Sequence, residues 1–288
     1  FERELETGAP VNTLSRRIAN KLVVSKITEA LGLDRLRCAA TGSAPISTST
    51  LRFFASLGLV IYEGYGMSET TAVATCPTYG RPTFGTVGPP LKGVELRIAD
   101  DDEILLRGPT MSKGYLRQPD KTAGLLDAEG WLHTGDLGSL DAEGNLRITG
   151  RKKDILITAG GKNIAPAEME ALILPIAGVG QVVVVGDRQP YLSALITVDV
   201  EALDQVNALL GTSASTAAEL AGESRFKDHL RDAIESGCNS AVARYQTIKR
   251  FEVLPVEFTV EGGELTPTMK LKRNVITDAW AQSGLEPL

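Results

Sequence analysis

Residues 131–170 read WLHTGDLGSLDAEGNLRITGRKKDILITAGGKNIAPAEME and join two kinds of predicted structure. On their N-terminal side, residues 94–149 hold short apolar segments separated by close turns, with DAEGN placed as a hairpin turn, so we predict an all-β segment. The charged residues 151–154 follow as a link. Beyond them, strands (DILIT, QVVVVG, LSALITV, IKRFEVL) alternate with helices that open near Pro166, Arg225 and Lys270. Pro166 suits the first position of a helix because no N–H is needed there.

Upstream of this stretch, apolar residues recur at helical spacing over residues 14–31 and stop at Gly32. A short strand at 36–40, a helix at 47–56 and an apolar strand at 59–62 follow. A helix followed by a strand, twice, is typical of an α/β layer with a largely buried sheet. We therefore predict an α/β fold with a large domain portion at 1–152, divided into an α/β layer (1–77) and a β-rich part (78–152), and a small α+β domain at 153–288.

Composition excludes several classes of protein. The net charge of −6 over 288 residues argues against a nucleic-acid-binding protein, which needs a basic face. Cys38, Cys76 and Cys238 lack metal-ligand spacing and predict a reducing compartment without a structural metal. With His133 and His229 as the two histidines, a hydrolase with a histidine base is disfavoured. The sequence holds no apolar run of the roughly 20 residues that a spanning helix needs. Because it opens at Phe1 rather than Met, we expect a piece of a longer protein.

Three separated segments carry the chemistry. In YEGYGMSETT (62–71), two glycines allow close backbone approach, and an aromatic ring, a hydroxyl and a carboxylate follow them. Asp136 follows Gly135 in an expected turn, where a carboxylate can accept hydrogen bonds from two neighbouring hydroxyls. The third segment, LTPTMKLKR (265–273), presents Lys270 on a long flexible stem.

In this order and spacing, the three segments resemble those of the adenylate-forming ligases, and among them the long-chain fatty acid CoA ligases, which are AMP-forming acyl-CoA synthetases. The resemblance covers almost the whole chain. It implies the C-terminal part of the large adenylate-forming domain followed by a small mobile domain. It also implies that Tyr65 packs against adenine, that Ser68 contacts phosphate and that Glu69 helps to hold Mg²⁺. The small residues of TGSAP (41–45), among them Ser43 and Ala44, are implied to line the adenine site with Gly64 and Gly66.

For the ribose and the small domain, the resemblance implies further roles. Asp136 grips the ribose, and Arg151 supplies a second ribose contact. Lys153 marks the hinge, chosen over Asp154 by its spacing after Arg151. The turn of Gly160, Gly161 and Lys162 edges the pantetheine tunnel of CoA. Lys270 reaches the α-phosphate and the acyl carboxylate, with Lys272 as the alternative, since the segment departs from the commoner TxxGK form. We expect His133 to be a structural turn residue.

The implied activity is ATP-dependent conversion of a long-chain fatty acid to acyl-AMP and then to acyl-CoA, with ATP, Mg²⁺ and CoA. The phosphate loop and the acyl pocket are not recognisable here, so we expect the N-terminal half of the enzyme to be missing, the piece alone to be inactive, and some apolar surface to be exposed. Two alternatives stay open: a fatty acyl-AMP ligase that loads a carrier protein, although no insertion precedes Arg151, and a non-catalytic nucleotide-binding module. We expect a cytoplasmic protein that can touch the inner membrane face peripherally.

Overall fold

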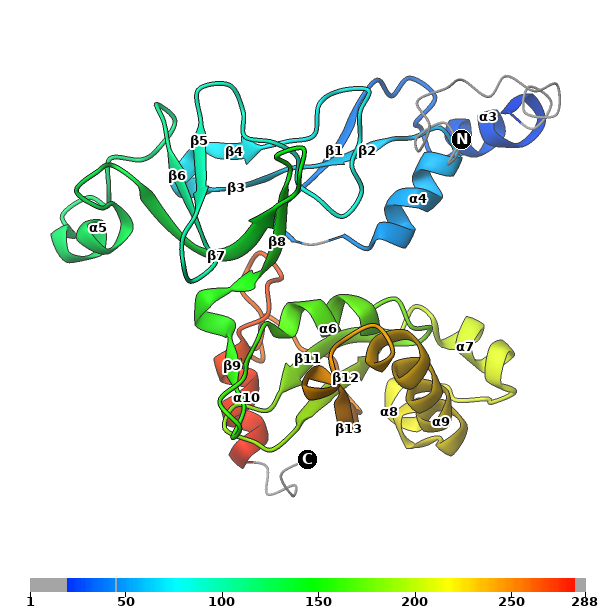
Figure 1. Ribbon diagram of the computed structural model, residues 1–288. Helices are drawn as coiled ribbons and strands as arrows, with labels where there is room; N and C mark the ends of the chain where they lie inside the picture. The colour runs from blue at the N-terminus through cyan, green and yellow to red at the C-terminus, as the bar shows by residue number, and fades with distance from the viewer. Residues whose placement is uncertain (1–19, 45, 283–288) are drawn as a thin grey trace. The chain divides into compact units, whose positions relative to one another are not determined.

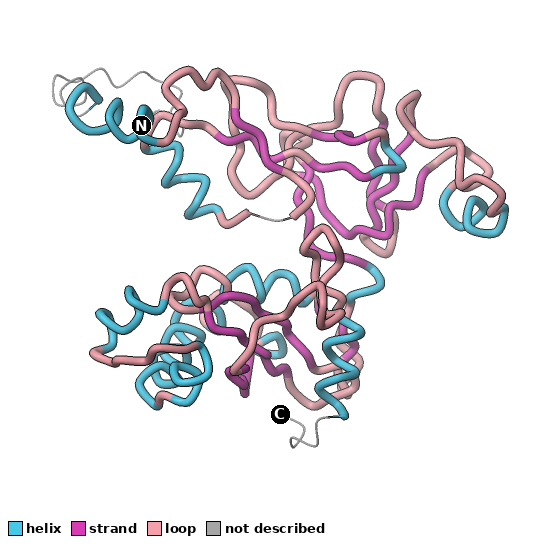
Figure 2. Tube along the Cα trace, turned by 180° about the vertical axis from the view of Figure 1, so that it is seen from behind, coloured by secondary structure: helices cyan, strands magenta, loops and turns pink. Residues whose placement is uncertain are grey.

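The computed structural model describes residues 20–44 and 46–282. The chain divides between Thr149 and Gly150 into two compact units, called here the first and the second unit. The first unit is built mainly of strands and loops, whereas helices surround a sheet in the second (Figures 1 and 2). This mixture confirms the α/β class expected from the sequence.

The first unit begins with helices that alternate with two short strands. Of the helix expected at 14–31, residues 14–19 lie outside the described part, and the rest is helical up to Ala30, with Gly32 at φ +68°. Ser47 caps the next helix, because its Oγ accepts a hydrogen bond from Thr50 N at 3.1 Å. The elements are a π-helical turn Asn20–Val24, α3 Ser25–Ala30, β1 Ala39–Thr41, α4 Thr48–Ser56 and β2 Ile61–Glu63.

Strands β1 and β2 pair in parallel, as the helix–strand alternation predicts. Their sheet, however, is not largely buried: in the described chain Tyr62 is the single buried residue of the two strands. Neighbouring helices expose large apolar side chains, and Phe53 of α4 is 59% accessible. The expected exposure of apolar surface is therefore present at this end of the unit.

The rest of the first unit is a β-rich part around a four-stranded sheet of order β5-β6-β7-β8. The DAEGN turn joins β7 to β8, with Gly144 at φ +83° and Asp141 N bonded to Asn145 O. The expectation of an all-β segment was wrong, because helix α5 opens on Pro119 within it. The elements are β3 Tyr65–Met67, a 3₁₀ turn Ser68–Thr70, β4 Ala72–Thr75, β5 Glu95–Ile98, β6 Glu103–Arg107, α5 Pro119–Leu125, β7 Leu132–Leu140 and β8 Leu146–Arg151.

The second unit is organised by a three-stranded sheet of order β11-β12-β13 (Figure 1). Strand β12 pairs antiparallel with β11 and parallel with β13, and every residue of β12 is buried. Successive side chains of a strand point to opposite faces. Val182 and Val184 accordingly join the core formed with α6, α8 and α9, while Val183 packs on the other face with Leu265 and Ile276.

The elements of the second unit are a 3₁₀ turn Lys152–Asp154, β9 Leu156–Ile157, β10 Asn163–Ile164, α6 Pro166–Ile173, β11 Val179–Val185, β12 Leu192–Val198, α7 Leu203–Leu210, α8 Ala217–Gly222, α9 Ser224–Ala233, a π-helical turn Ile234–Asn239, a 3₁₀ turn Arg244–Gln246, β13 Ile248–Leu254 and α10 Arg273–Gln282. Pro166 takes the first position of α6, as predicted. The helix expected near Lys270 begins later, at Arg273, so Lys270 lies in the turn that precedes it.

Candidate functional site

The ends of β1 and β2 bring two of the motif segments together. Gly64 N donates a hydrogen bond to Thr41 O at 2.9 Å, and a Cβ placed on Gly42 would lie 3.0 Å from Gly64 O. Ser43 and Ala44, which follow at once, are exposed, and Ser43 has a φ of +70°. Pro45 of the same segment lies outside the described residues. The backbone next to Gly64 thus lies beside the segment that was expected to line the adenine site.

Gly66 lies in the tight hairpin of β3 and β4. A Cβ on Gly66 would lie 1.7 Å from the carbonyl oxygen of Ala72, so a side chain cannot fit without moving the backbone. Glycine is therefore needed at position 66 because the facing strand leaves no room for a side chain. From the sequence alone, this glycine was instead explained by close approach to a ligand. The hairpin ends in the turn that carries exposed Ser68 and half-buried Glu69. Thr71 and Ala72 complete it at φ +58° and +78°.

Tyr65 and Asp136, 71 residues apart in sequence, meet in the first unit. The Tyr65 hydroxyl donates a hydrogen bond to Asp136 Oδ2 at 2.7 Å. The prediction that Asp136 lies in a turn was wrong: it lies inside β7, just after Gly135, whose φ of +69° bends the strand. Asp136 is 8% exposed, and its N–H donates to Thr134 Oγ1 at 3.1 Å. The aromatic and carboxylate residues of two separate motifs are therefore in direct contact.

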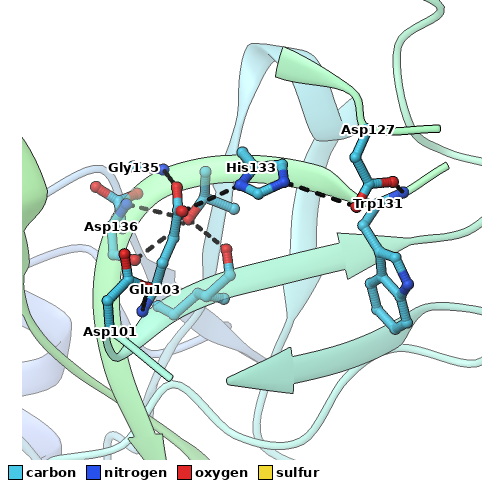
Figure 3. A network of polar contacts seen from close by, with 9 residues as sticks. Asp101, Glu103, Asp127, Trp131, His133, Gly135 and Asp136 are labelled. Carbon is cyan, nitrogen blue, oxygen red and sulfur yellow. Dashed lines mark hydrogen bonds and ion pairs between the residues drawn. The ribbon is translucent and has the colours of Figure 1, made fainter. Parts of the chain in front are cut away.

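A buried carboxylate that the sequence analysis did not single out supports this bend (Figure 3). Glu103 Oε1 accepts a hydrogen bond from Gly135 N at 2.9 Å, and Glu103 Oε2 lies 3.0 Å from His133 Nδ1. Because an ionised carboxylate only accepts, Nδ1 carries the proton of this bond. His133 Nε2 lies 3.7 Å from Asp127 Oδ2. The sequence signal for Glu103 was a charged residue that opens the apolar segment EILLR.

His133 is therefore not the turn residue that we predicted. It lies in β7 between the carboxylates of Glu103 and Asp127, and its structural role stays a prediction. Asp127 organises the loop before β7: its Oδ1 accepts hydrogen bonds from Trp131 N at 2.8 Å and from Glu129 N at 2.9 Å. These backbone bonds, from Trp131 first, hold the pKa of Asp127 below its usual value. The loop and the bend thus meet at His133, whose ring lies between the carboxylates of Asp127 and Glu103.

Glu69 also has a partner that sequence reasoning missed. The Tyr115 hydroxyl donates to Glu69 Oε1 at 2.5 Å, and Ser112 N donates to Glu69 O at 2.7 Å. The hydrogen bond to Glu69 raises the pKa of Tyr115, so the phenol keeps its proton and the carboxylate is the acceptor. Segment 112–115 thus orients the carboxylate at the tip of the β3–β4 hairpin.

The predicted site residues of the second unit lie on three separate exposed segments. Arg151 is exposed at the end of β8, and Lys153 is exposed in the 3₁₀ turn that follows. In the β9–β10 hairpin, Gly161 adopts a φ of +73° and Lys162 N bonds Thr158 Oγ1 at 3.1 Å. The Lys162 ammonium lies 5.8 Å from the centre of the Tyr245 ring. Gly160 is exposed in the same turn.

Lys270 projects from a tight turn closed by its own backbone. Thr266 N donates to Lys270 O at 2.8 Å, and Lys270 N donates to Thr266 Oγ1 at 3.0 Å. Met269 has a φ of +61°, which the turn requires. Leu265 and Leu271 form a β-bridge at its base. The exposed Lys270 thus lies opposite Thr266 in a short hairpin whose tip is formed by residues 267–268. The alternative Lys272 lies past the bridge, where it is half-buried.

Models of one protein family match both units. The AMP-binding enzyme model matches residues 6–116, and the model of the AMP-binding enzyme C-terminal domain matches residues 153–283. The chain belongs to the AMP-binding enzymes. This assignment confirms the resemblance to adenylate-forming ligases that the motifs indicated.

Curated relatives and solved structures agree with this family. Long-chain-fatty-acid–CoA ligase FadD15 of Mycobacterium bovis is 42% identical over 267 residues, which cover 92% of this chain and 44% of the relative. Long-chain-fatty-acid–CoA ligase ACSBG1 of Mus musculus is 36% identical, over 96% of this chain and 42% of the relative. The adenylation domain of a carboxylate reductase from Mycobacterium chelonae superposes with a TM-score of 0.68 at 26% identity, over 97% of this chain and 42% of that chain. The chain therefore spans less than half the length of these relatives.

None of the helices in residues 20–44 and 46–282 has the length and apolar character needed to span a bilayer. Within the same ranges, no group of three or more His, Cys, Asp or Glu side chains is arranged to hold a metal ion.

Proposed function

We propose that this chain forms the C-terminal part of a long-chain fatty acid CoA ligase. The full enzyme would convert a fatty acid, ATP and CoA to acyl-CoA, AMP and pyrophosphate. Relatives named long-chain-fatty-acid–CoA ligase, at 36–42% identity over more than nine tenths of this chain, support that substrate class. The enzyme would be about the length of those relatives, with the triphosphate loop and the acyl pocket in the N-terminal half.

The observation that carries this proposal is the contact between Tyr65 and Asp136. One unit of the protein places a flat aromatic ring, which can stack on a base, next to a carboxylate that keeps lone pairs for hydroxyl donors. An adenine and its ribose need this combination at neighbouring positions. Because Asp136 is 8% exposed, little water competes for its oxygens. The Gly64 backbone and the exposed Ser43 and Ala44 lie at the neighbouring strand ends, where they would border the base.

Glu69 and Ser68 would serve the phosphates. Glu69 is held by Tyr115 through one oxygen, and its carboxylate suits Mg²⁺, which typically takes one or two protein carboxylates and completes its shell with water and substrate phosphate oxygens. A Mg²⁺ ion bound there would neutralise charge on the phosphates. The Ser68 hydroxyl is exposed in the same turn and can donate to a phosphate oxygen.

The reaction has two steps in this proposal. A carboxylate oxygen of the fatty acid attacks the α-phosphorus of ATP, which forms the acyl-AMP bond and releases pyrophosphate. The CoA thiol then loses its proton and attacks the acyl carbon, and the bond to AMP breaks. Lys270 would stabilise the negative charge of the first step, a contribution of about 3–4 kcal/mol for such a preorganised group. Arg151 would contact the ribose.

The second unit would serve both steps by rotating about Lys153. In the thioester step, the glycine turn would lie along the pantetheine arm, because Gly160 and Gly161 have no side chains to block it. Lys162 borders that turn. We place the enzyme in the cytoplasm, with peripheral contact at the inner membrane face. The reason for this contact is that long-chain fatty acids are apolar and partition into the membrane.

The test is fatty-acid-dependent exchange between ATP and labelled pyrophosphate in the full-length enzyme. Asp136→Ala should slow exchange roughly ten- to a hundredfold, since hydrogen bonds to a charged group contribute about 1.5–3 kcal/mol. Asp136→Asn keeps one acceptor and should lie between that variant and the wild type. Asp120→Ala, an exposed carboxylate of α5, is the control and should match the wild type. Unchanged exchange in Asp136→Ala would contradict the nucleotide site.

A further inference from the structure

The turn that carries Lys270 is fastened to the second unit on both sides. Before the turn, Leu265 is 1% exposed and packs in a core cluster with Val183 and Ile276. After the turn, Arg273 opens helix α10. The exposed lysine in this turn is therefore held five residues upstream by the apolar packing of Leu265 and three residues downstream by the contacts of Arg273.

Arg273 contacts the sheet and α6 through the two terminal nitrogens of its guanidinium group. Its Nη2 donates to Glu170 Oε1 at 2.6 Å and to Oε2 at 2.8 Å, and its Nη1 donates to Val184 O at 2.8 Å. Glu170 Oε1 in turn accepts from Val184 N at 2.7 Å. The two charged side chains thus bond both the N–H and the carbonyl oxygen of Val184 in β11. Such a bidentate arrangement fixes orientation as well as distance.

This ion pair is largely shielded from solvent. The side chains of Arg273 and Glu170 are 17% and 14% accessible, whereas the Arg231–Asp228 pair of α9 is 63% and 65% accessible. Burial raises the pKa of Glu170, and the charge of Arg273 opposes this shift. Within the described residues, Arg273 Nε is also buried without a hydrogen-bond partner. Desolvation of this kind makes a buried pair a weak source of stability, and apolar replacement of both partners is often neutral.

The Glu170–Arg273 pair contributes little to stability, yet it lies directly beside the turn that carries Lys270. Its presence there is explained if the pair fixes the geometry of that turn. We propose that Glu170 and Arg273 are positioning residues, which fix the place and direction in which the Lys270 turn leaves the second unit. The inference rests on the function proposed above, because it assigns Lys270 to adenylation. The pair then matters for the formation of acyl-AMP and not for the attack of the CoA thiol. Displacement of a reacting group by about 1 Å can cost roughly a hundredfold in rate.

The experiment measures the two half-reactions separately in the full-length enzyme. Adenylation is followed by fatty-acid-dependent pyrophosphate exchange, and thioester formation by the release of AMP from supplied acyl-AMP and CoA. Arg273→Met and Glu170→Gln should each lower kcat of adenylation roughly ten- to a hundredfold and leave thioester formation within about twofold. Arg273→Lys, which keeps the charge and loses the fork, should fall between them and the wild type. Arg231→Met, an exposed ion-pair arginine in the same unit, is the matched control and should change neither step.

A double variant separates positioning from folding. Glu170→Met with Arg273→Met replaces the buried pair by apolar side chains, so it should keep the thermal midpoint of the wild type and still adenylate slowly. Recovery of both the midpoint and the adenylation rate in this variant would overturn the inference, and so would equal losses in the two half-reactions. A wild-type enzyme without any fatty-acid-dependent exchange would instead refute the proposed function. The two failures are therefore distinguishable.

Discussion

Removal of the Glu103 carboxylate should loosen the bend that presents Asp136. Glu103 is 5% exposed, and Glu103→Ala would leave two donors without their acceptor, Gly135 N and His133 Nδ1. An unsatisfied buried donor costs about 1–3 kcal/mol, and the His133 side chain is 37% accessible, so water can replace its lost bond. The net loss of the His133 bond adds about 1 kcal/mol to the cost at Gly135 N, so we expect a total of about 2–4 kcal/mol in the folding of the first unit.

In Glu103→Ala, the free energy of ATP binding should change less than the free energy of folding. Asp136 keeps a second tether, because its N–H still donates to Thr134 Oγ1. The expected result is a Kd for ATP raised roughly tenfold, equivalent to about 1.4 kcal/mol, together with a lower thermal midpoint. Titration calorimetry and a thermal melt of the full-length enzyme measure both quantities. Glu95→Ala on the adjacent strand removes an exposed carboxylate paired with Arg107 and should leave the thermal midpoint and the Kd for ATP close to the wild-type values. Wild-type ATP affinity and melting in Glu103→Ala would refute the reasoning.

Three further predictions concern other residues. Lys270→Ala should slow adenylation roughly a hundred- to a thousandfold and leave thioester formation from supplied acyl-AMP intact, which the two half-reaction assays check; equal losses would refute its role. Gly66→Ala should destabilise the protein by about 1–3 kcal/mol or more, seen as a lower melting midpoint, because its Cβ would meet the facing strand; an unchanged midpoint would show that the hairpin can open. Burial raises the pKa of Cys238 to about 11, so at pH 8 iodoacetamide and mass spectrometry should find exposed Cys38 alkylated and Cys238 intact, and rapid labelling of both would contradict the core packing.

Periodicity predicted the elements whose pattern is local. The ELRI segment is strand β5, and IKRFEVL is strand β13, with the bounds read from the sequence. Local pattern failed where tertiary contacts decide the backbone. The bend at Gly135 reads as a turn, yet the strand continues through it because Glu103, 32 residues away, holds the backbone N–H. Helix α5, seven residues long, went unseen within a β-rich stretch because it is too short to show a periodic apolar face.

The candidate site shows the same division. Residues with a recognisable chemical type in a motif, such as Tyr65, Asp136 and Lys270, were named from the sequence alone. Tyr115 was not, because its contact with Glu69 spans 46 positions and a single tyrosine beside a glycine carries no signal. The hydrogen bonds between Glu170 and the arginine that follows Lys270 span 103 positions. Such partners are brought together only in the folded chain. Sequence motifs therefore predict the reacting residues more easily than they predict the residues that position them.

The central claim is the activity of the full enzyme, and product analysis tests it most directly. The full-length protein would be incubated with ATP, Mg²⁺, CoA and saturated fatty acids of graded length centred on palmitate, and the products identified by mass spectrometry. We predict acyl-CoA together with AMP and pyrophosphate, with the yield ranking the chain lengths. Acyl-AMP that accumulates without a thioester would instead indicate a carrier-protein acceptor. The absence of any adenylate would contradict the account and favour a nucleotide-binding module.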